Sequence, residues 1–216
     1  ELEEMTAKGM GGADIWDVHA YINPDQMIPA GPTFLGEVSL KAVAHALKEA
    51  KRLGLSLGMV AASGWNAGGT WVKPPDAGMG LFHSQVSVKG PTTFSQVLPF
   101  PEVPEACPKD ADGRPLFYKD VAVLAVPQEE GQTLEATDSV IDLSKYYDKE
   151  RLTWDVPAGQ WTILRFVMSN TGYQLIAQSP NSGGPMIDFL NPESTRMHFG
   201  TIMNRLESEL GDIKDF

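Results

Sequence analysis

Residues 39–62, SLKAVAHALKEAKRLGLSLGMVAA, decide the predicted fold because they join a helix to a strand through Gly54. The apolar residues of the first half recur at helical spacing, and basic residues fall in its last turn, where the helix dipole favours cations. We therefore expect a helix with Ser39 as its N-cap and Gly54 as its end. Residues 55–62 are continuously apolar, which is typical of a buried strand in a parallel sheet.

The preceding segment has the same order of elements. Residues 2–8 have the pattern of a helix end, residues 11–18 that of a short buried strand, and residues 21–36 hold three prolines in a polar loop. Strands that alternate with helices indicate a parallel α/β sheet, either open or closed into a barrel. Such folds place their sites at the carboxyl ends of the strands, and both predicted strands end in polar residues.

The pattern changes near residue 85, where short alternating runs predict an antiparallel β domain. Residues 157–160, Pro-Ala-Gly-Gln, are expected to form a hairpin turn between strands 152–156 and 161–168. Trp154 and Trp161 flank this turn as a cross-strand pair.

The α/β pattern then returns. Two strand-like runs, 173–178 and 185–190, lead to a helix that begins at Asn191-Pro192-Glu193, with an N-cap amide, a proline and an acid. The apolar stripe expected along this helix consists of Phe199, Ile202, Met203, Leu206 and Leu210. The predicted domains are therefore 1–84 and 171–216 as α/β segments and 85–170 as an inserted β-sandwich-like domain.

Composition narrows the possible partners. The 216 residues carry a net charge of −11, which argues against nucleic acid and against an anionic membrane surface. No apolar run approaches the roughly 20 residues that span a bilayer. Cys107 is the single cysteine, so the chain has no internal disulfide and no cysteine-based zinc site. Neutral substrates, or cations held by carboxylates, remain compatible with this charge.

Residues 63–75, SGWNAGGTWVKPP, are the strongest candidate for a binding loop. Trp65 and Trp71 offer flat apolar faces with a polar handle, and Asn66 adds an amide, a combination that suits a sugar better than a phosphate. The glycine spacing does not match a nucleotide-binding loop. The alternative is a structural turn in which tryptophan covers a core.

Polar residues also follow the predicted strands. Asp17 and His19 would share one face of their strand, with Trp16 on the other, and are suited to hydrogen bonding of sugar hydroxyls, metal ligation or proton transfer. Asp188 follows an apolar run in the same way, and the glycine-rich loop 181–184 is expected to line the same pocket. The structural alternatives are a loop cap for Asp17, a solvated His19, and a helix-terminus partner for Asp188. The remaining histidines, His45, His83 and His198, have no partner at ligand spacing.

Residues 64–74, GWNAGGTWVKP, resemble the Gly-Trp…Gly-Gly-Pro-Trp-Ile/Val-x-Pro signature of glycoside hydrolase family 106, the α-L-rhamnosidases. Residues 118–125, YKDVAVLA, resemble the family's Tyr-Arg-Asp-Val-Ala-Val-x-Ala segment. Residues 154–165 resemble its Trp-x-x-Pro-x-Gly-x-Trp-x-Ile-x-Arg hairpin. Thr70 replaces the usual proline of the first motif.

The resemblance implies a (β/α)₈ barrel, present here as a partial barrel with an inserted antiparallel β domain. It also implies an exported bacterial enzyme, secreted or periplasmic, that removes L-rhamnose from plant glycans by an inverting reaction assisted by calcium. The catalytic acids are expected downstream, in the remainder of a longer polypeptide from which this chain is a piece. The residues expected to bind substrate are Asp17, His19, Trp65, Asn66, Trp71 and Asp188.

Two other functions are compatible with the sequence. A non-catalytic carbohydrate-binding module would bind sugar without turnover, and its binding would depend on Trp65. A purely structural fragment would expose apolar faces and self-associate.

Overall fold

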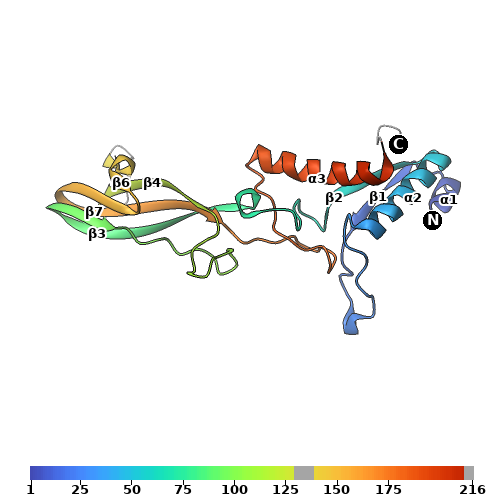
Figure 1. Ribbon diagram of the computed structural model, residues 1–216, viewed down its shortest axis with the longest axis horizontal. Coiled ribbons are helices and arrows are strands. Elements are labelled where there is room, and N and C mark those ends of the chain that lie inside the picture. Colours follow the sequence, from blue (N-terminus) through green and yellow to red (C-terminus); the bar gives the residue numbers. More distant parts are fainter. Residues whose placement is uncertain (129–138, 212–216) are drawn as a thin grey trace. The chain divides into compact units, whose positions relative to one another are not determined.

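The computed structural model describes residues 1–128 and 139–211 (Figure 1). The chain divides into two compact units. The α/β unit comprises Glu1–Gly78 and Tyr173–Phe216, and the β unit comprises Met79–Gly172. No helix among the described residues is both long and apolar enough to cross a membrane.

The α/β unit holds the expected helix–strand–helix–strand order. Its elements are α1 (Leu2–Ala7), β1 (Gly12–Asp17), the 3₁₀ turn η1 (Pro24–Gln26), α2 (Glu37–Leu53), β2 (Ser56–Ser63), η2 (Pro74–Asp76) and α3 (Pro192–Leu210). β1 and β2 pair in parallel, as predicted, with Gly12 opposite Ser56. α2 ends as expected at Gly54, which has φ +72°. Its N-cap is Gly36 and not Ser39, because the chain already turns into the helix where Gly36 N–H donates to Thr33 O.

α3 begins as predicted, since the Asn191 side chain accepts a hydrogen bond from Glu193 N at 3.0 Å. The predicted apolar stripe is partly wrong, because Phe199 and Met203 are exposed while Ile202 is buried. The buried residues of this helix follow each other at a spacing of four: Ser194, His198 and Ile202. A packed histidine and serine thus replace two of the expected apolar contacts.

The predicted partial (β/α)₈ barrel is wrong. In the described parts of the chain, the strands form one two-stranded parallel sheet and one five-stranded antiparallel sheet, and neither closes on itself. The runs 173–178 and 185–190 are not strands. They make single bridges, Gln174 with Pro185, Met186 with Gly68 and Ile187 with Ala77, so their partners are loop residues that cannot extend a ladder.

The β unit is built on two long strands. Its elements are β3 (Met79–Val97), β4 (Tyr118–Pro127), β5 (Ile141–Asp142), the turn η4 (Ser144–Tyr146), β6 (Tyr147–Asp148) and β7 (Arg151–Asn170). The sheet order is β3-β7-β4-β5, and β6 pairs with β7. All pairings are antiparallel, as expected for this segment (Figure 1).

The predicted hairpin at residues 157–160 is wrong, because β7 runs through this segment as one strand. β3 pairs with it on both sides, with a register shift after Gly90, which lies opposite Gly159. A partner strand that continues past the turn-like residues makes them an irregularity in a longer ladder. Trp154 and Trp161 do pack together, edge to face with ring centres 5.6 Å apart, but both belong to β7.

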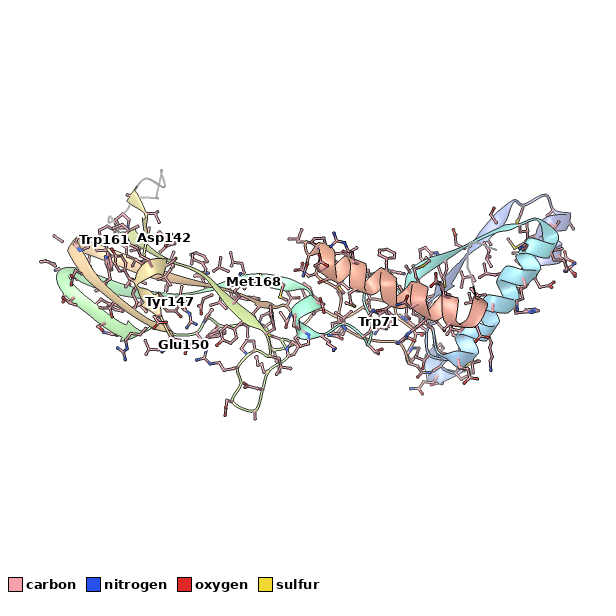
Figure 2. All side chains as sticks on the ribbon, turned by 45° about the horizontal axis from the view of Figure 1, so that its top comes forward. Trp71, Asp142, Tyr147, Glu150, Trp161 and Met168 are labelled. Atoms are coloured by element: carbon pink, nitrogen blue, oxygen red, sulfur yellow. The ribbon has the colours of Figure 1, made fainter. Side chains whose placement is uncertain are left out.

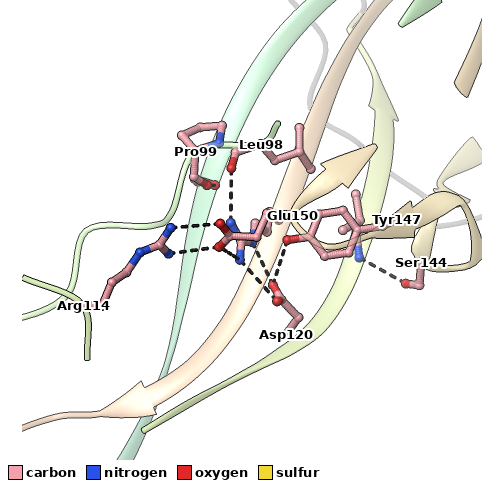
Figure 3. A network of polar contacts seen from close by, with 10 residues as sticks. Leu98, Pro99, Arg114, Asp120, Ser144, Tyr147 and Glu150 are labelled. Carbon is pink, nitrogen blue, oxygen red and sulfur yellow. Dashed lines mark hydrogen bonds and ion pairs between the residues drawn. The ribbon is translucent and has the colours of Figure 1, made fainter. Parts of the chain in front are cut away.

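A charged network lies inside the β unit (Figure 3). The Arg165 side chain is only 1% exposed and donates to both carboxylate oxygens of Asp120, at 2.7 and 3.2 Å, and to Glu150 at 3.0 Å. It also donates to Leu98 O at 3.2 Å. Arg114 holds Glu150 from the other side with two hydrogen bonds, at 3.0 and 2.9 Å. The network therefore connects β4 and β7 to the segments that precede them.

Candidate functional site

The carboxyl ends of β1 and β2 meet at Asp17. Ser63 Oγ donates to Asp17 Oδ1 at 2.5 Å, and Gly64 N–H donates to Asp17 O at 2.7 Å. Ser63 is buried and in turn accepts a hydrogen bond from Ser179 N at 2.9 Å. One carboxylate oxygen is thus held by a fixed donor. The other oxygen receives no hydrogen bond from the residues that the structure describes.

A chain of buried hydroxyls supports this carboxylate. Ser179 Oγ donates to Ser182 Oγ at 2.9 Å, and Ser182 Oγ accepts from Phe34 N at 2.8 Å. Ser63 and Ser182 belong to loops predicted to bind ligand, but their connection to each other through Ser179 was not predicted. Ser63 and Ser182 each precede a glycine, but residues this distant in the sequence give no local sign that they meet.

Asp17 and His19 line one cavity of about 540 Å³ in the α/β unit. The cavity's other walls come from the loop between β1 and α2 and from the segment before α3. Its lining residues are Trp16, Asp17, Val18, His19, Ala20, Asn23, Ile28, Pro29, Ala30, Gly31, Pro32, Gln178, Ser179 and Pro180. Clefts that bind small ligands commonly have volumes of about 300–1,000 Å³.

Strict strand alternation, which placed Trp16 and Asp17 on opposite faces, does not hold at this end of β1. Ile15 pairs with Met59, whereas Asp17 pairs with Ser63. A step of two residues along β1 therefore corresponds to a step of four residues along β2. Such an irregularity redirects side chains locally. As a result, both Trp16 and Asp17 line the cavity.

The loop that forms the cavity wall is tied down at several points. The Asn23 side chain accepts from Ile28 N at 2.8 Å and donates to Ile28 O at 2.7 Å. Asn181 Nδ2 donates to Gly31 O at 2.6 Å. The His19 ring stacks on Tyr21 with ring centres 6.1 Å apart and planes 13° from parallel. The loop therefore presents His19 in a defined orientation.

Trp65 and Asn66 lie next to this edge but do not line the cavity. Trp65 N–H donates to Ile176 O at 3.0 Å, while its side chain is 58% exposed. Gly64, with φ +87°, makes this turn possible, because a Cβ there would lie 2.2 Å from Ile176 O. Asn66 Oδ1 is buried and has no hydrogen-bond partner among the described residues.

Trp71 belongs to the packing around α3 (Figure 2). Its Nε1–H donates to His198 Nδ1 at 3.3 Å, the two rings stack at 5.7 Å, and the Arg205 guanidinium lies 5.0 Å from the indole centre. His198 is buried, and its Nε2 lies 2.8 Å from Ala61 O. This pairing assigns the imidazole proton to Nε2, and burial lowers the pKa of His198. His198 therefore packs inside the unit, with Trp71 and Ala61 as its hydrogen-bond partners.

Asp188 lies just before α3 and does not line the cavity. Its Oδ1 accepts from Leu190 N at 3.0 Å, and its backbone N–H donates to Asp76 O at 2.8 Å. Of the six predicted binding residues, the structure thus brings only Asp17 and His19 together in one cavity.

The described residues contain no group of three or more His, Cys, Asp or Glu side chains that could hold a metal ion. They therefore do not fit a calcium site built from side-chain carboxylates. The calcium dependence implied by the resemblance stays a prediction.

Comparisons with known proteins place this fold. The family model described as alpha-L-rhamnosidase, glycoside hydrolase family 106, matches residues 1–136 and 115–214. A solved structure, the rhamnosidase from Novosphingobium sp. PP1Y, superposes with a TM-score of 0.74 at 18% identity over 98% of this chain and 35% of that chain.

A protein of Formosa agariphila, provisionally named as a β-glucuronidase, is 28% identical over 246 aligned positions. The alignment covers 99% of this chain, which spans only 20% of the length of that relative. Because the family model covers nearly the whole sequence, the chain belongs to glycoside hydrolase family 106, the α-L-rhamnosidases.

Proposed function

We propose that this chain is part of a glycoside hydrolase that removes terminal L-rhamnose, or a related sugar, from plant-derived glycans, and that its cavity holds part of the substrate. The observation that carries this proposal is Asp17, whose carboxylate is fixed by buried Ser63 and lines the cavity. A carboxylate held in this way accepts hydrogen bonds from sugar hydroxyls without reorganising. No residue of this chain is assigned as general acid or base.

The cavity lining favours a neutral sugar. It contains one carboxylate, Asp17, and no lysine or arginine. A uronic acid would bring a second negative charge close to Asp17 without a lysine or arginine in the lining to balance it. Rhamnose carries no charge, so we favour it over the glucuronic acid in the name of the Formosa relative. Export of the protein and its calcium dependence stay predictions from the family resemblance.

The first test is sugar binding by the 216-residue chain, measured by ligand-observed NMR and calorimetry with L-rhamnose and D-glucuronate. We expect Asp17→Asn to weaken rhamnose binding about tenfold, because hydrogen bonds to a charged group contribute about 1.5–3 kcal/mol. Ile22→Ala is the control, since this exposed loop residue does not line the cavity. Tighter binding of glucuronate than of rhamnose, or an unchanged affinity of Asp17→Asn, would contradict the proposal.

The alternative, a non-catalytic carbohydrate-binding module, draws support from the exposed indole of Trp65. The hydrolase would cleave a rhamnoside, whereas the binding module would bind it without cleavage. The full product of the gene should be assayed with p-nitrophenyl α-L-rhamnoside, with and without Asp17→Asn. Release of nitrophenol that falls in the variant supports the hydrolase, whereas binding with no release in any condition supports the module.

A further inference from the structure

Trp16 lies near the carboxyl end of β1 and is 58% exposed. It lines the same cavity as Asp17 because of the register irregularity between β1 and β2. Trp65 has an equal exposed fraction, 58%, but lies outside the lining. The indole in the cavity wall is therefore that of Trp16, and not that of Trp65 in the glycine-rich loop.

The side chains around Trp16 divide the cavity lining by chemistry. Val18 and Ile28 are apolar, as are the prolines of the loop, whereas Asp17, Gln178 and Ser179 carry hydrogen-bonding groups. Ligand sites of this kind bind apolar faces on aromatic side chains and fix orientation with a few polar groups. The lining therefore suits a ligand that has both hydroxyls and a flat apolar surface.

Trp16 and Asp17 both line the cavity, each with its own side chain. A sugar whose hydroxyls bond to Asp17 therefore occupies a different part of the cavity from a ring that lies flat on Trp16. The volume of about 540 Å³ falls in the range of clefts that hold ligands of several rings. A ligand with two rings would place one ring at Asp17 and the other on Trp16.

We propose that Trp16 is a specificity-determining residue, whose indole stacks on the ring attached to the terminal sugar, so that the site prefers a rhamnoside with a second ring. This inference rests on the proposed function, which places the terminal sugar at Asp17. The second ring is either a sugar of a glycan chain or an aromatic group, because both present a flat face to an indole.

The loop that contributes Ile28 is held in place before a ligand arrives, by the bonds of Asn23 and Asn181 described above. A wall that is already ordered loses little conformational entropy on binding. Stacking on Trp16 consequently adds to the affinity instead of compensating for the ordering of a loop.

The test measures dissociation constants of the 216-residue chain for three compounds: methyl α-L-rhamnoside, p-nitrophenyl α-L-rhamnoside and a rhamnosyl disaccharide. The wild type should bind at least one of the two-ring compounds about threefold to tenfold more tightly than the methyl glycoside. Trp16→Ala should abolish this preference, because it weakens the two-ring compounds far more than the methyl glycoside, and Trp16→Phe should restore most of it. A gain for the nitrophenyl compound alone assigns an aromatic group, and a gain for the disaccharide alone assigns a sugar.

Trp65→Ala is the matched control, because Trp65 is equally exposed at the same edge of the unit. The inference is overturned if Trp65→Ala and not Trp16→Ala removes the preference, if Trp16→Ala weakens all three compounds equally, or if the wild type shows no preference. Failure of the proposed function is separate. It would appear as unchanged binding of the methyl glycoside by Asp17→Asn, whatever Trp16 does.

Discussion

Arg165 offers a quantitative test of how the β unit is stabilised, through its replacement by methionine. The guanidinium is 1% exposed and contacts Asp120, Glu150 and the carbonyl of Leu98. Removing one partner of a buried ion pair typically costs about 3–5 kcal/mol, because a charge is left uncompensated. Here the two carboxylates keep 32% and 29% exposure, so water hydrates them in part. We therefore expect Arg165→Met to lower the free energy of unfolding of the β unit by about 3 kcal/mol.

The matched control is Arg114→Met. Arg114 pairs with the same Glu150 in good geometry but is 39% exposed. Exposed ion pairs contribute about 0.2–1 kcal/mol, so this variant should cost less than about 1 kcal/mol. Adding Asp120→Asn to Arg165→Met should recover part of the loss, because it removes one uncompensated charge.

The assay is urea unfolding, monitored through the NMR signal of the Trp161 indole N–H. Trp161 lies in the β unit, so this signal reports on that unit alone. A local signal is needed because unfolding of a chain with two units need not be two-state. If Arg165→Met costs no more unfolding free energy than Arg114→Met, burial does not determine the strength of this network.

The same network should make the β unit sensitive to acid. Burial raises the pKa of Glu150, but hydrogen bonds from Arg165 and Arg114 outweigh it and hold the pKa below its usual value of 4.5. A lowered carboxylate pKa contributes stability that is complete above pH 4.5 and is lost as the pH falls through the folded-state value. The urea concentration at the unfolding midpoint should therefore decrease as the pH is lowered below 4.5. The decrease should be smaller in Arg165→Met. Equal losses in both proteins would exclude this explanation.

Two further predictions concern the α/β unit. Because burial lowers the pKa of His198, the unfolded chain binds more protons than the folded chain below pH 6.5. The free energy of unfolding should therefore fall by up to about 1.4 kcal/mol for each pH unit below 6.5. His198→Gln should reduce this pH dependence, measured by urea titrations at pH 5 to 8. Gly64→Ala should lower the free energy of unfolding by at least about 2 kcal/mol, since its Cβ would meet Ile176 O. Gly54→Ala, which has a similar φ but no neighbouring atom in the way, should lower it by about 1 kcal/mol. Equal thermal shifts for the two glycine variants would show that the contact with Ile176 does not matter.

Local sequence patterns predicted much of the α/β unit. Helical spacing identified α2 and α3, Gly54 marked the end of one, and Asn191 marked the start of the other. The parallel pairing of β1 with β2 followed from their alternation with helices. Asp17 and His19 were found in the same way, because residues that follow parallel strands meet at one edge of the sheet.

Other features depended on partners distant in the sequence. Residues 157–160 have the composition of a turn, yet β3 pairs on both sides of them and keeps β7 continuous. The predicted barrel assumed that the apolar runs before α3 were strands, but only loop residues were available to pair with them. A strand exists only where another backbone completes its hydrogen bonds, and composition does not reveal that backbone.

Local sequence was enough to predict the helices, the parallel strand pair and the edge where polar residues gather, because these depend on spacing and on capping groups within a few residues. Tertiary structure alone decided that His198 is buried against Trp71 and Ala61, and that Ser63 holds Asp17. It also decided that Trp16, and not Trp65, lines the cavity. The physical reason is that such contacts arise where separate segments pack together, and a small change in strand register determines which side chains meet.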